Sequence, residues 1–340
     1  MKKVTLIVAA LFAGSFTFAQ VGNTAQHHVT GSDNKSTTEQ YGNFNDGITT
    51  QDGDDNRAYQ WQKGDLNEVE IWQEGDEHKA DQLQKGDDNK AVSVSGKFAT
   101  ANKMKTYQEQ VGDDNLSRFE MQKGYSSYGY SWQKGDKNHT FLRVRGDHNK
   151  AYFTQKGDRN VGSAVQKGDD NRSFVTSLGD DNTVGTKWGT ASGTAGVYQE
   201  GDDNRAEAYQ KGDRNDAMFS QIGDDNRAYT EQKGDDNLAE TYQHGYDNRG
   251  WIEQVGMEND AFINQVPGYM PTGNLADINQ YGDYNWAQAD QFNSYNKAFI
   301  TQKGDANWAL SQQAGDYNRT EIYQKGMDRS EEHTSELQSL

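Results

Sequence analysis

The sequence contains no cysteine and only two prolines, and 32% of its 340 residues are hydrophobic. Without cysteine the chain can form neither a disulfide framework nor a thiolate metal site. The low hydrophobic content excludes a large apolar core, and by itself it also fits a disordered low-complexity chain. However, aromatic residues reach 11%, and the apolar residues follow a fixed period, which favours an ordered, repetitive fold.

A long apolar run occurs only at the N-terminus, where Lys2 and Lys3 precede the mostly apolar residues 4–18 and Ala19 ends a small-residue cleavage pattern. This arrangement predicts that residues 1–19 are a secretory signal peptide, because the run is too short for a membrane span. A buried N-terminal strand is the alternative. The signal peptide predicts an exported protein, with no membrane insertion by the remaining chain.

The charge is strongly acidic, with 52 acidic against 34 basic residues and a formal net charge of −18. An acidic balance of this size disfavours nucleic acid and anionic membrane surfaces as partners.

One phrase, Gln-x-Gly-Asp-x-Asn-x-Ala, returns every eleven residues along most of the chain. A short fixed period indicates one structural unit stacked many times. With the Gln as position 0, the recurrent Asn (+5), Ala (+7), an often apolar residue (+9) and the next Gln (+11) fall on alternate positions, which is strand periodicity with these side chains on one face. The residues Gly-Asp-x-Asn are typical of a tight turn. Each unit is therefore predicted to be a strand of about six residues and a turn.

Two units are predicted to form one coil, because position +9 alternates small and large side chains, as in Ala289, Ile300 and Ser311. The predicted fold is all-β: a two-sheet β-solenoid with 22 residues per coil, about 13 coils and a length of about 60 Å at about 4.8 Å per rung. Inward amides would stack on their copies one rung away as ladders. The residues predicted to form this inward assembly ladder are Gln51, Gln62, Gln84, Gln199, Gln210, Gln221, Gln232, Gln280, Gln291, Gln302, Gln313, Gln324, Asn56, Asn204, Asn226, Asn285 and Asn307.

The repeat sets the predicted boundaries. Residues 20–39 are interpreted as a flexible segment or cap, and residues 40–328 as the solenoid. Irregular insertions near 95–107, 186–198 and 266–279 are interpreted as loops, with domain breaks as the alternative, and a one-residue excess between Gln110 and Gln122 predicts a β-bulge. Residues 329–340 leave the repeat and resemble the translation of a sequencing-adapter oligonucleotide, so they are interpreted as an artefactual tail or else a polar tail.

The spacing of the repeat is similar to that of the curlin repeat. The segment from Gln280 to Gln291 fits it residue by residue, with Gly282, Asn285 and Ala287 in their places. The resemblance covers roughly residues 40–328 and implies a subunit of curli-like functional amyloid, exported and assembled outside the cell in biofilm matrix. It also implies self-association and curli-type secretion and nucleation partners. The chain is longer than typical curlin subunits, so major subunit, nucleator and curlin-repeat adhesin remain alternatives. Its turns are richer in Asp, which suggests tighter control of when assembly begins.

Other chemistry has weaker support in the sequence. Paired turn carboxylates such as Asp202 and Asp203 suggest calcium binding, but the period differs from that of the calcium-binding nonapeptide repeat, and no cofactor is predicted. The seven His keep no common repeat position, so no catalytic residue or enzyme activity is predicted. The outward aromatics are explained either by pairing along the sheet or by contacts with other fibres or glycans: Tyr59, Trp61, Trp72, Trp132, Tyr209, Tyr242, Trp251 and Tyr323.

The sequence is compatible with two alternative functions. The first is a self-assembling fibre subunit, and the second is a monomeric secreted β-solenoid that acts as an adhesin or binds an ion or a glycan. The end rungs distinguish them, because a fibre former leaves them uncapped and a monomer requires a polar cap.

Overall fold

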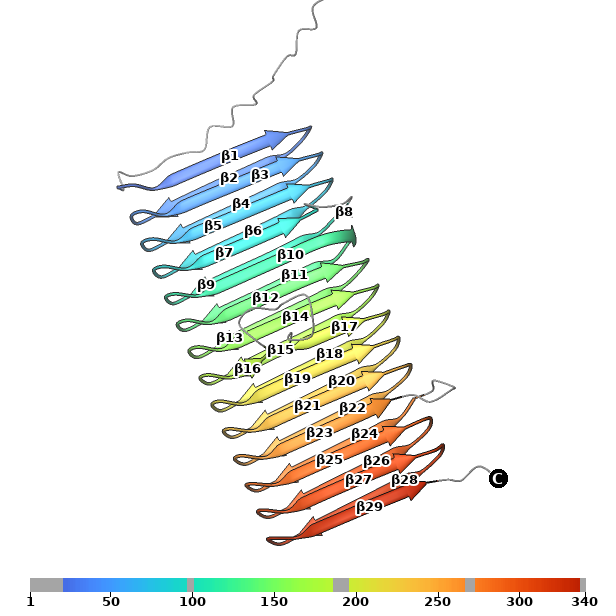
Figure 1. Cartoon of the computed structure of the whole chain (residues 1–340). Helices are drawn as coiled ribbons and strands as arrows, with labels where there is room; N and C mark the ends of the chain where they lie inside the picture. Colours follow the sequence, from blue (N-terminus) through green and yellow to red (C-terminus); the bar gives the residue numbers. More distant parts are fainter. Residues whose placement is uncertain (1–20, 97–100, 186–195, 267–272, 337–340) are drawn as a thin grey trace, which may run out of the picture.

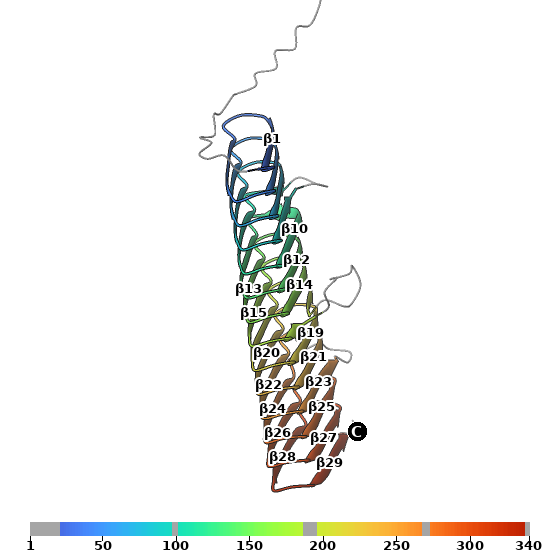
Figure 2. The same cartoon turned by 90° about the vertical axis from the view of Figure 1, so that its left-hand side faces the viewer.

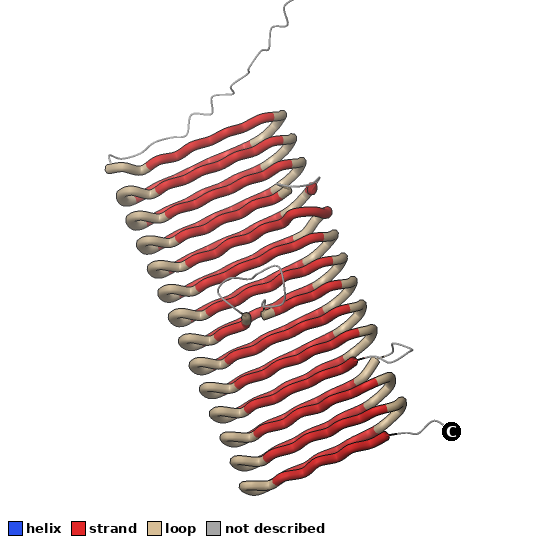
Figure 3. The backbone as a smooth tube through the Cα atoms, in the orientation of Figure 1, coloured by secondary structure: helices blue, strands red, loops and turns tan. Residues whose placement is uncertain are grey.

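The computed structural model describes residues 21–96, 101–185, 196–266 and 273–336, and the side chains as far as residue 334. Figures 1 and 3 show strands stacked side by side along one axis and joined by short turns. The described residues include no helix with the length and hydropathy of a membrane span. Residues 1–19, the predicted signal peptide, lie outside the described residues.

The strands form two parallel sheets that face each other (Figure 2). The first sheet runs in the order β1 (Thr24–Thr30), β3 (Asp46–Asp52), β5 (Glu68–Glu74), β7 (Lys90–Ser95), β10 (Leu116–Tyr125), β12 (His139–Arg145), β14 (Val161–Lys167), β16 (Thr183–Val184), β19 (Asp216–Ile222), β21 (Leu238–His244), β23 (Asp260–Val266), β25 (Trp286–Phe292), β27 (Trp308–Ala314) and β29 (Ser330–Glu336), with β8 (Ala101–Asn102) pairing with β10 and β17 (Val197–Glu200) with β14 and β19. The second sheet runs in the order β2 (Lys35–Tyr41), β4 (Arg57–Lys63), β6 (Lys79–Lys85), β9 (Lys105–Val111), β11 (Tyr128–Lys134), β13 (Lys150–Lys156), β15 (Arg172–Leu178), β18 (Arg205–Lys211), β20 (Arg227–Lys233), β22 (Arg249–Val255), β24 (Leu275–Tyr281), β26 (Lys297–Lys303) and β28 (Arg319–Lys325).

Each strand pairs in parallel with the strand two units away, so that Ala206 of β18 lies beside Ala228 of β20 and Gln210 beside Gln232. Ladder partners are 22 residues apart in the regular coils. The predicted fold class, a two-sheet β-solenoid with 22 residues per coil, is confirmed.

The core lies between the sheets and is built from positions +5, +7, +9 and +11. In β20 the side chains of Ala228, Thr230 and Gln232 are buried and Arg227 is exposed. The alternation at +9 has the predicted cause, since Ala289 lies in the first sheet and Ile300 in the second. The middle of the solenoid is instead filled by large apolar side chains, including Phe119 and Phe153, whose ring centroids are 6.4 Å apart.

The turns continue the rung-to-rung hydrogen bonding of the strands. In the turn after β20, the amide of Gly234 donates to the carbonyl of Lys211 at 2.9 Å, and that of Asp236 donates to Asp213 at 3.0 Å. Asp236 has a φ of +58°, a left-handed conformation that Asp and Asn adopt more readily than most residues. Because the turns stack as closely as the strands, each coil is bonded to the next around its whole circumference.

The irregular coils are longer than 22 residues, but the sheets remain continuous across them. Gln84 and its ladder partner Gln110 are separated by 26 positions in the sequence, Gln166 and Gln199 by 33, and Gln254 and Gln280 by 26. The register between β10 and β12 shifts between Met121 and Lys123, where the sequence predicted a bulge. Residues 97–100, 186–195 and 267–272 of the three predicted insertions lie outside the described residues.

The two terminal segments also contain strands. Residues 24–41, within and next to the segment interpreted as flexible or as a cap, form β1 and β2, and these pair with β3 and β4. At the other end, β29 pairs with β27 within the segment interpreted as an artefactual tail. The solenoid of the described residues therefore extends beyond the predicted boundaries of 40 and 328.

Candidate assembly interface

The glutamines at position 0 form hydrogen-bonded amide ladders inside the solenoid. In the second sheet, Gln210 Nε2 donates to Gln232 Oε1 at 3.1 Å, and Gln302 Nε2 donates to Gln324 Oε1 at 2.8 Å. In the first sheet, Gln199 Nε2 donates to Gln221 Oε1 at 2.9 Å. The donor belongs to the earlier coil in each of these bonds, so the ladders have one direction.

Each glutamine also ties the two sheets together. Gln221 Nε2 donates at 2.9 Å to the carbonyl of Arg205 in the second sheet, and Gln232 Nε2 donates at 2.9 Å to that of Asp216 in the first. The two amide protons therefore have different partners, one along the ladder and one across the coil. Since a buried amide is costly unless it is paired, this arrangement fixes the glutamine in its inward orientation.

Where a ladder meets an apolar neighbour, an amide oxygen loses its partner. Gln51 pairs with Val29 on one side, and Gln166 with Val144. Within the described residues, the buried Oε1 atoms of Gln51 and Gln166 accept no hydrogen bond. An unsatisfied buried acceptor costs about 1–3 kcal/mol, so a shift of register that opposes Gln to an apolar residue carries this cost at every rung it affects.

The asparagines at +5 form a second kind of ladder at the turns. Asn226 Nδ2 donates to Asn204 Oδ1 at 3.1 Å and to the carbonyl of Gly245 at 2.7 Å, and the amide of Asn226 donates to Asn204 Oδ1 at 3.1 Å. Each Asn thus joins the turn of its own coil to the coils before and after it.

Three successive coils lack this asparagine in the turn that leads from the first sheet to the second, and have His78, Met104 and Ser127 in its place. Burial lowers the pKa of His78, and its Nδ1 accepts the amide of Met104 at 3.2 Å.

The turn aspartates at +3 are hydrogen-bond acceptors as well as surface charges. Asp224 Oδ1 accepts the backbone amide of Asp202 in the preceding coil at 2.9 Å. An amide oxygen can take this place, since Asn102 Oδ1 accepts the amide of Asp76 at 3.1 Å. At +4, burial and then the stacked carboxylates Asp170 and Asp225 raise the pKa of Asp203. The +4 carboxylates therefore repel one another along the stack.

The structure places every residue of the predicted ladder inside the solenoid, with relative exposure of 1% or less. Sequence reasoning missed a second set of amides at +9, where Gln82 Nε2 donates to Gln108 Oε1 at 2.9 Å. Gln108 follows the first insertion, so the eleven-residue count does not connect it to Gln82.

Of the predicted outward aromatics, Tyr242, Trp251 and Tyr323 are exposed, and the ring of Trp251 stacks on that of Tyr229 with centroids 4.0 Å apart. Among the described residues, no group of three His, Asp or Glu could hold a metal ion.

Two parallel sheets of stacked 22-residue coils, joined inside by Gln and Asn ladders, define a two-sheet β-solenoid. Its units are identified by a family profile, the curlin associated repeat, which matches residues 42–75, 201–234, 234–266, 272–304 and 295–326. The chain therefore carries curlin associated repeats at these five places. These matches all lie outside residues 76–200, where His78, Met104 and Ser127 replace the turn asparagine. A comparison with curated proteins gave no match.

Proposed function

We propose that the mature chain is a secreted structural subunit that assembles, coil on coil, into curli-like fibres of the cell surface and biofilm matrix. The curlin repeats and the solenoid support this role. One observation carries it: the second-sheet ladder begins at Gln40, which donates to Gln62 Oε1 at 2.8 Å, and its last bond is from Gln302 to Gln324. Among the described residues, no amide stacks before Gln40 or beyond Gln324, so the ladder ends in an acceptor at one end and a donor at the other.

The two ends also match in register. Strands β1 to β28 form complete coils, so a second copy placed after the coil β27–β28 would continue it with its own β1 and β2. Gln40 of the second copy would then follow Gln324. The open strand edges add backbone donors and acceptors that template the next copy, and the amides restrict it to one register.

This function implies further partners. Export to the cell surface by a curli-type secretion apparatus and initiation by a nucleating partner are parts of the proposal. They are supported by the family of the repeats and by the predicted signal peptide at residues 1–19.

A specific observation favours the alternative, a monomeric secreted solenoid that acts as an adhesin or binds an ion or a glycan. Strand β29 places Glu331 beside Ala309 and His333 beside Ser311, which are inward positions in the coils before it. A charged residue at an inward position of an edge strand discourages pairing with another copy. If residues 329–340 belong to the natural protein, they would serve as this cap.

The deciding experiment is to incubate the purified chain with residues 329–340 removed, and to follow thioflavin fluorescence and electron micrographs. Fibres with a 4.7–4.8 Å repeat along their axis in diffraction are expected. A chain that keeps its β-sheet circular dichroism but stays monomeric for days at high concentration would support the alternative.

A further inference from the structure

The outer face of the second sheet carries two rows of exposed cations in an otherwise acidic protein. The first row stands at the first residue of its strands and consists of Lys35, Arg57, Lys79, Lys105, Lys150, Arg172, Arg205, Arg227, Arg249, Lys297 and Arg319. The second row, called here the Lys row, stands at the last residue and consists of Lys63, Lys85, Lys134, Lys156, Lys211, Lys233, Lys303 and Lys325. The two rows are six positions apart in sequence, or about 20 Å along a strand.

These cations exceed the carboxylates on the same face. The strands of the second sheet contribute nineteen Lys and Arg against eight acids, namely Glu39, Asp81, Glu109, Glu207, Glu231, Glu253, Asp277 and Glu321. The strands of the first sheet carry a net negative charge. Within the Lys row, Lys233 pairs with Glu231 at 2.6 Å, and the described residues give no other member a carboxylate partner. The face therefore has about one uncompensated positive charge per rung.

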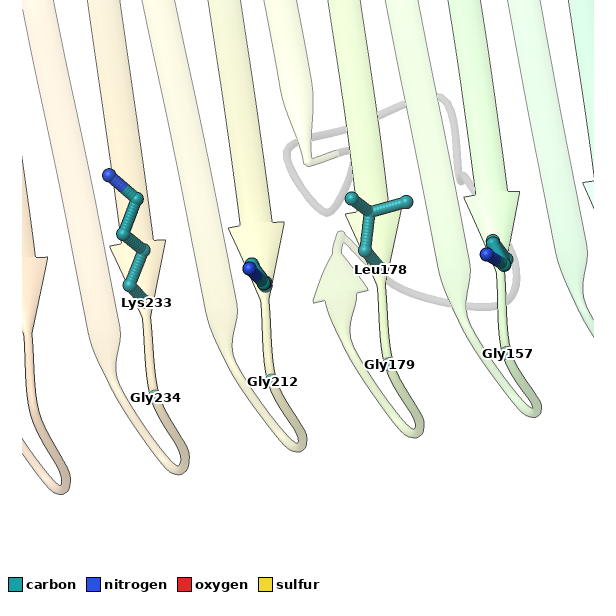
Figure 4. Close-up of a pocket in the computed structure, with 8 residues that line it drawn as sticks. Gly157, Leu178, Gly179, Gly212, Lys233 and Gly234 are labelled. Atoms are coloured by element: carbon teal, nitrogen blue, oxygen red, sulfur yellow. The ribbon is translucent and has the colours of Figure 1, made fainter.

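The Lys row borders shallow grooves that run along the C-terminal ends of the strands of the second sheet. One groove, of about 640 Å³, is lined by Lys156, Leu178, Lys211 and Lys233 together with the turn glycines that follow each of them. Figure 4 shows Leu178 and Lys233 at the ends of their strands, directly before the turns that begin with Gly179 and Gly234. A second groove, of about 600 Å³, repeats the arrangement around Lys63 and Lys85. Because glycine has no side chain, the ammonium groups stand beside open backbone.

In chain order, the irregular parts fall outside the strands of the second sheet and outside the turns that follow those strands. Residues 97–100 fall between β7 and β8 of the first sheet, and residues 186–195 between β16 and β17 of the same sheet. Residues 267–272 fall between β23 of the first sheet and β24 of the second, and the register shift lies in β10 of the first sheet. The strands of the second sheet and the turns that follow them keep their regular spacing. The Lys row is thus interrupted by substitutions, as at Val111 and Leu178, but not by insertions.

We infer that this face binds a linear acidic polysaccharide with one carboxylate per sugar. Its net charge, about one per rung of about 4.8 Å, matches a polymer that carries one charge per sugar ring. Duplex DNA carries one charge per about 1.7 Å, nearly three per rung, and its excess charge would face the acidic turns on both sides. Between the rows, the half-buried rings of Tyr152 and Phe174 stack on each other with centroids 5.0 Å apart, and their outer edges add apolar surface to this face.

This face belongs to the single chain, so binding does not require fibre formation and can be measured on soluble protein. The probe is immobilised polygalacturonate, with a neutral glucan and duplex DNA for comparison. The test variant combines Lys134→Gln, Lys156→Gln and Lys211→Gln in the Lys row. The matched control combines Lys90→Gln, Lys123→Gln and Lys167→Gln on the first sheet, which makes the same change in net charge.

The full-length mature chain is expected to bind polygalacturonate, with an affinity that falls as salt rises. The Lys-row variant should bind at least about fivefold more weakly at low salt, and the first-sheet control should stay within about twofold of the unmodified chain. The triple change to Arg at the Lys-row positions should retain binding, which separates a loss of charge from a loss of fold. Equal losses in both Gln variants, no binding at low salt, or tighter binding to DNA than to polygalacturonate at equal salt would each overturn the inference.

Discussion

The carbonyl oxygen of Gly234 lies 2.2 Å from the position that a Cβ atom on Gly212 would occupy. The two glycines begin successive turns on the same side of the solenoid, and Gly212 has a φ of +118°. The stacking of the turns therefore depends on the absence of a side chain at +2, both for its backbone conformation and for the contact with the next coil.

Replacing Gly212 with Ala is expected to destabilise the solenoid by about 2–3 kcal/mol, because it forces a side chain into a positive-φ position against backbone. The measurement is the shift of the denaturant midpoint. Gly250→Ala is the matched control, since Gly250 stands at +7, where Ala is usual, and its added Cβ would meet the side chain of Thr241 at 3.0 Å. A small change of about 0.5–1 kcal/mol in either direction is expected there. Similar losses at both positions would contradict the role assigned to the turn glycine.

The terminal glutamines should differ in their effect on fibre growth. Gln313 Nε2 already donates to the carbonyl of Lys297 and to Thr320 Oγ1, whereas Gln324 Nε2 donates only to the carbonyl of Trp308 among the described residues. Gln324→Ala should therefore slow seeded growth of the chain without residues 329–340 more than Gln313→Ala does. Interior changes such as Gln232→Ala should have the smallest effect on growth rate, even where they lower stability. Equal growth rates for the end and interior variants would argue against templating by the end coil.

Neutralising stacked turn carboxylates should speed assembly. Asp170, Asp203 and Asp225 occupy +4 on successive coils with φ values of +55° to +58°, and Asn tolerates this conformation as Asp does. The triple Asp→Asn variant is expected to shorten the lag of fibre formation at low salt, and the difference should narrow as salt screens the charges. The control combines Asp52→Asn, Glu70→Gln and Glu240→Gln, which remove the same charge from the first sheet. If both variants shorten the lag equally, net charge rather than stacking sets the barrier.

The stability of the solenoid should depend on the ionisation of Asp216. Burial, and then the nearby Glu240, raises the pKa of Asp216 from 3.8 to about 6. The folded chain thus binds this proton more tightly than the unfolded chain, so the free energy of unfolding should fall as pH rises from about 4 to about 6. Asp216→Asn is expected to remove this part of the pH dependence, and to be more stable than the unmodified chain by about 1–2 kcal/mol at pH 7. Denaturant midpoints between pH 4 and pH 7 give the measurement, and an unchanged pH profile in the variant would contradict it.

Removal of residues 329–340 should increase the rate of assembly. It exposes the edge of β27 and takes away Glu331 and its neighbours, which place negative charge on the end coil. Lag times of the two chains at equal concentration provide the comparison. A longer lag after removal would mean that β29 contributes to the growing end instead of covering it.

The sequence was sufficient to predict the fold because one pattern sets every level of it. Alternating inward positions give the strands, Gly-Asp-x-Asn gives the turns, and the small-large alternation at +9 gives the two-unit coil. The inward orientation of the ladder residues follows from the same alternation. Directions of individual amide bonds, such as that from Gln302 to Gln324, depend on side-chain geometry that no sequence pattern encodes.

Two features escaped prediction for physical reasons. The insertion near residues 186–198 adds eleven residues, the length of one unit, so counting alone places Gln199 in the second sheet, whereas it pairs with Gln166 in the first. Only the loss of the inward pattern in that segment marks it as an insertion. His78 occupies the place of a turn Asn, and a ring nitrogen that accepts the amide of Met104 can be recognised only when the neighbouring coil is known.

Because consecutive strands alternate between the two sheets, the sheet to which a strand belongs depends on whether an even or an odd number of units precedes it. Loss or duplication of 22 residues would leave every later strand in its sheet, and the chain would only become shorter or longer. Loss of eleven residues would move every later strand to the opposite sheet and carry the Lys row to the other side of the solenoid. Recombination between neighbouring repeats should therefore be tolerated in pairs of units and disfavoured in single ones.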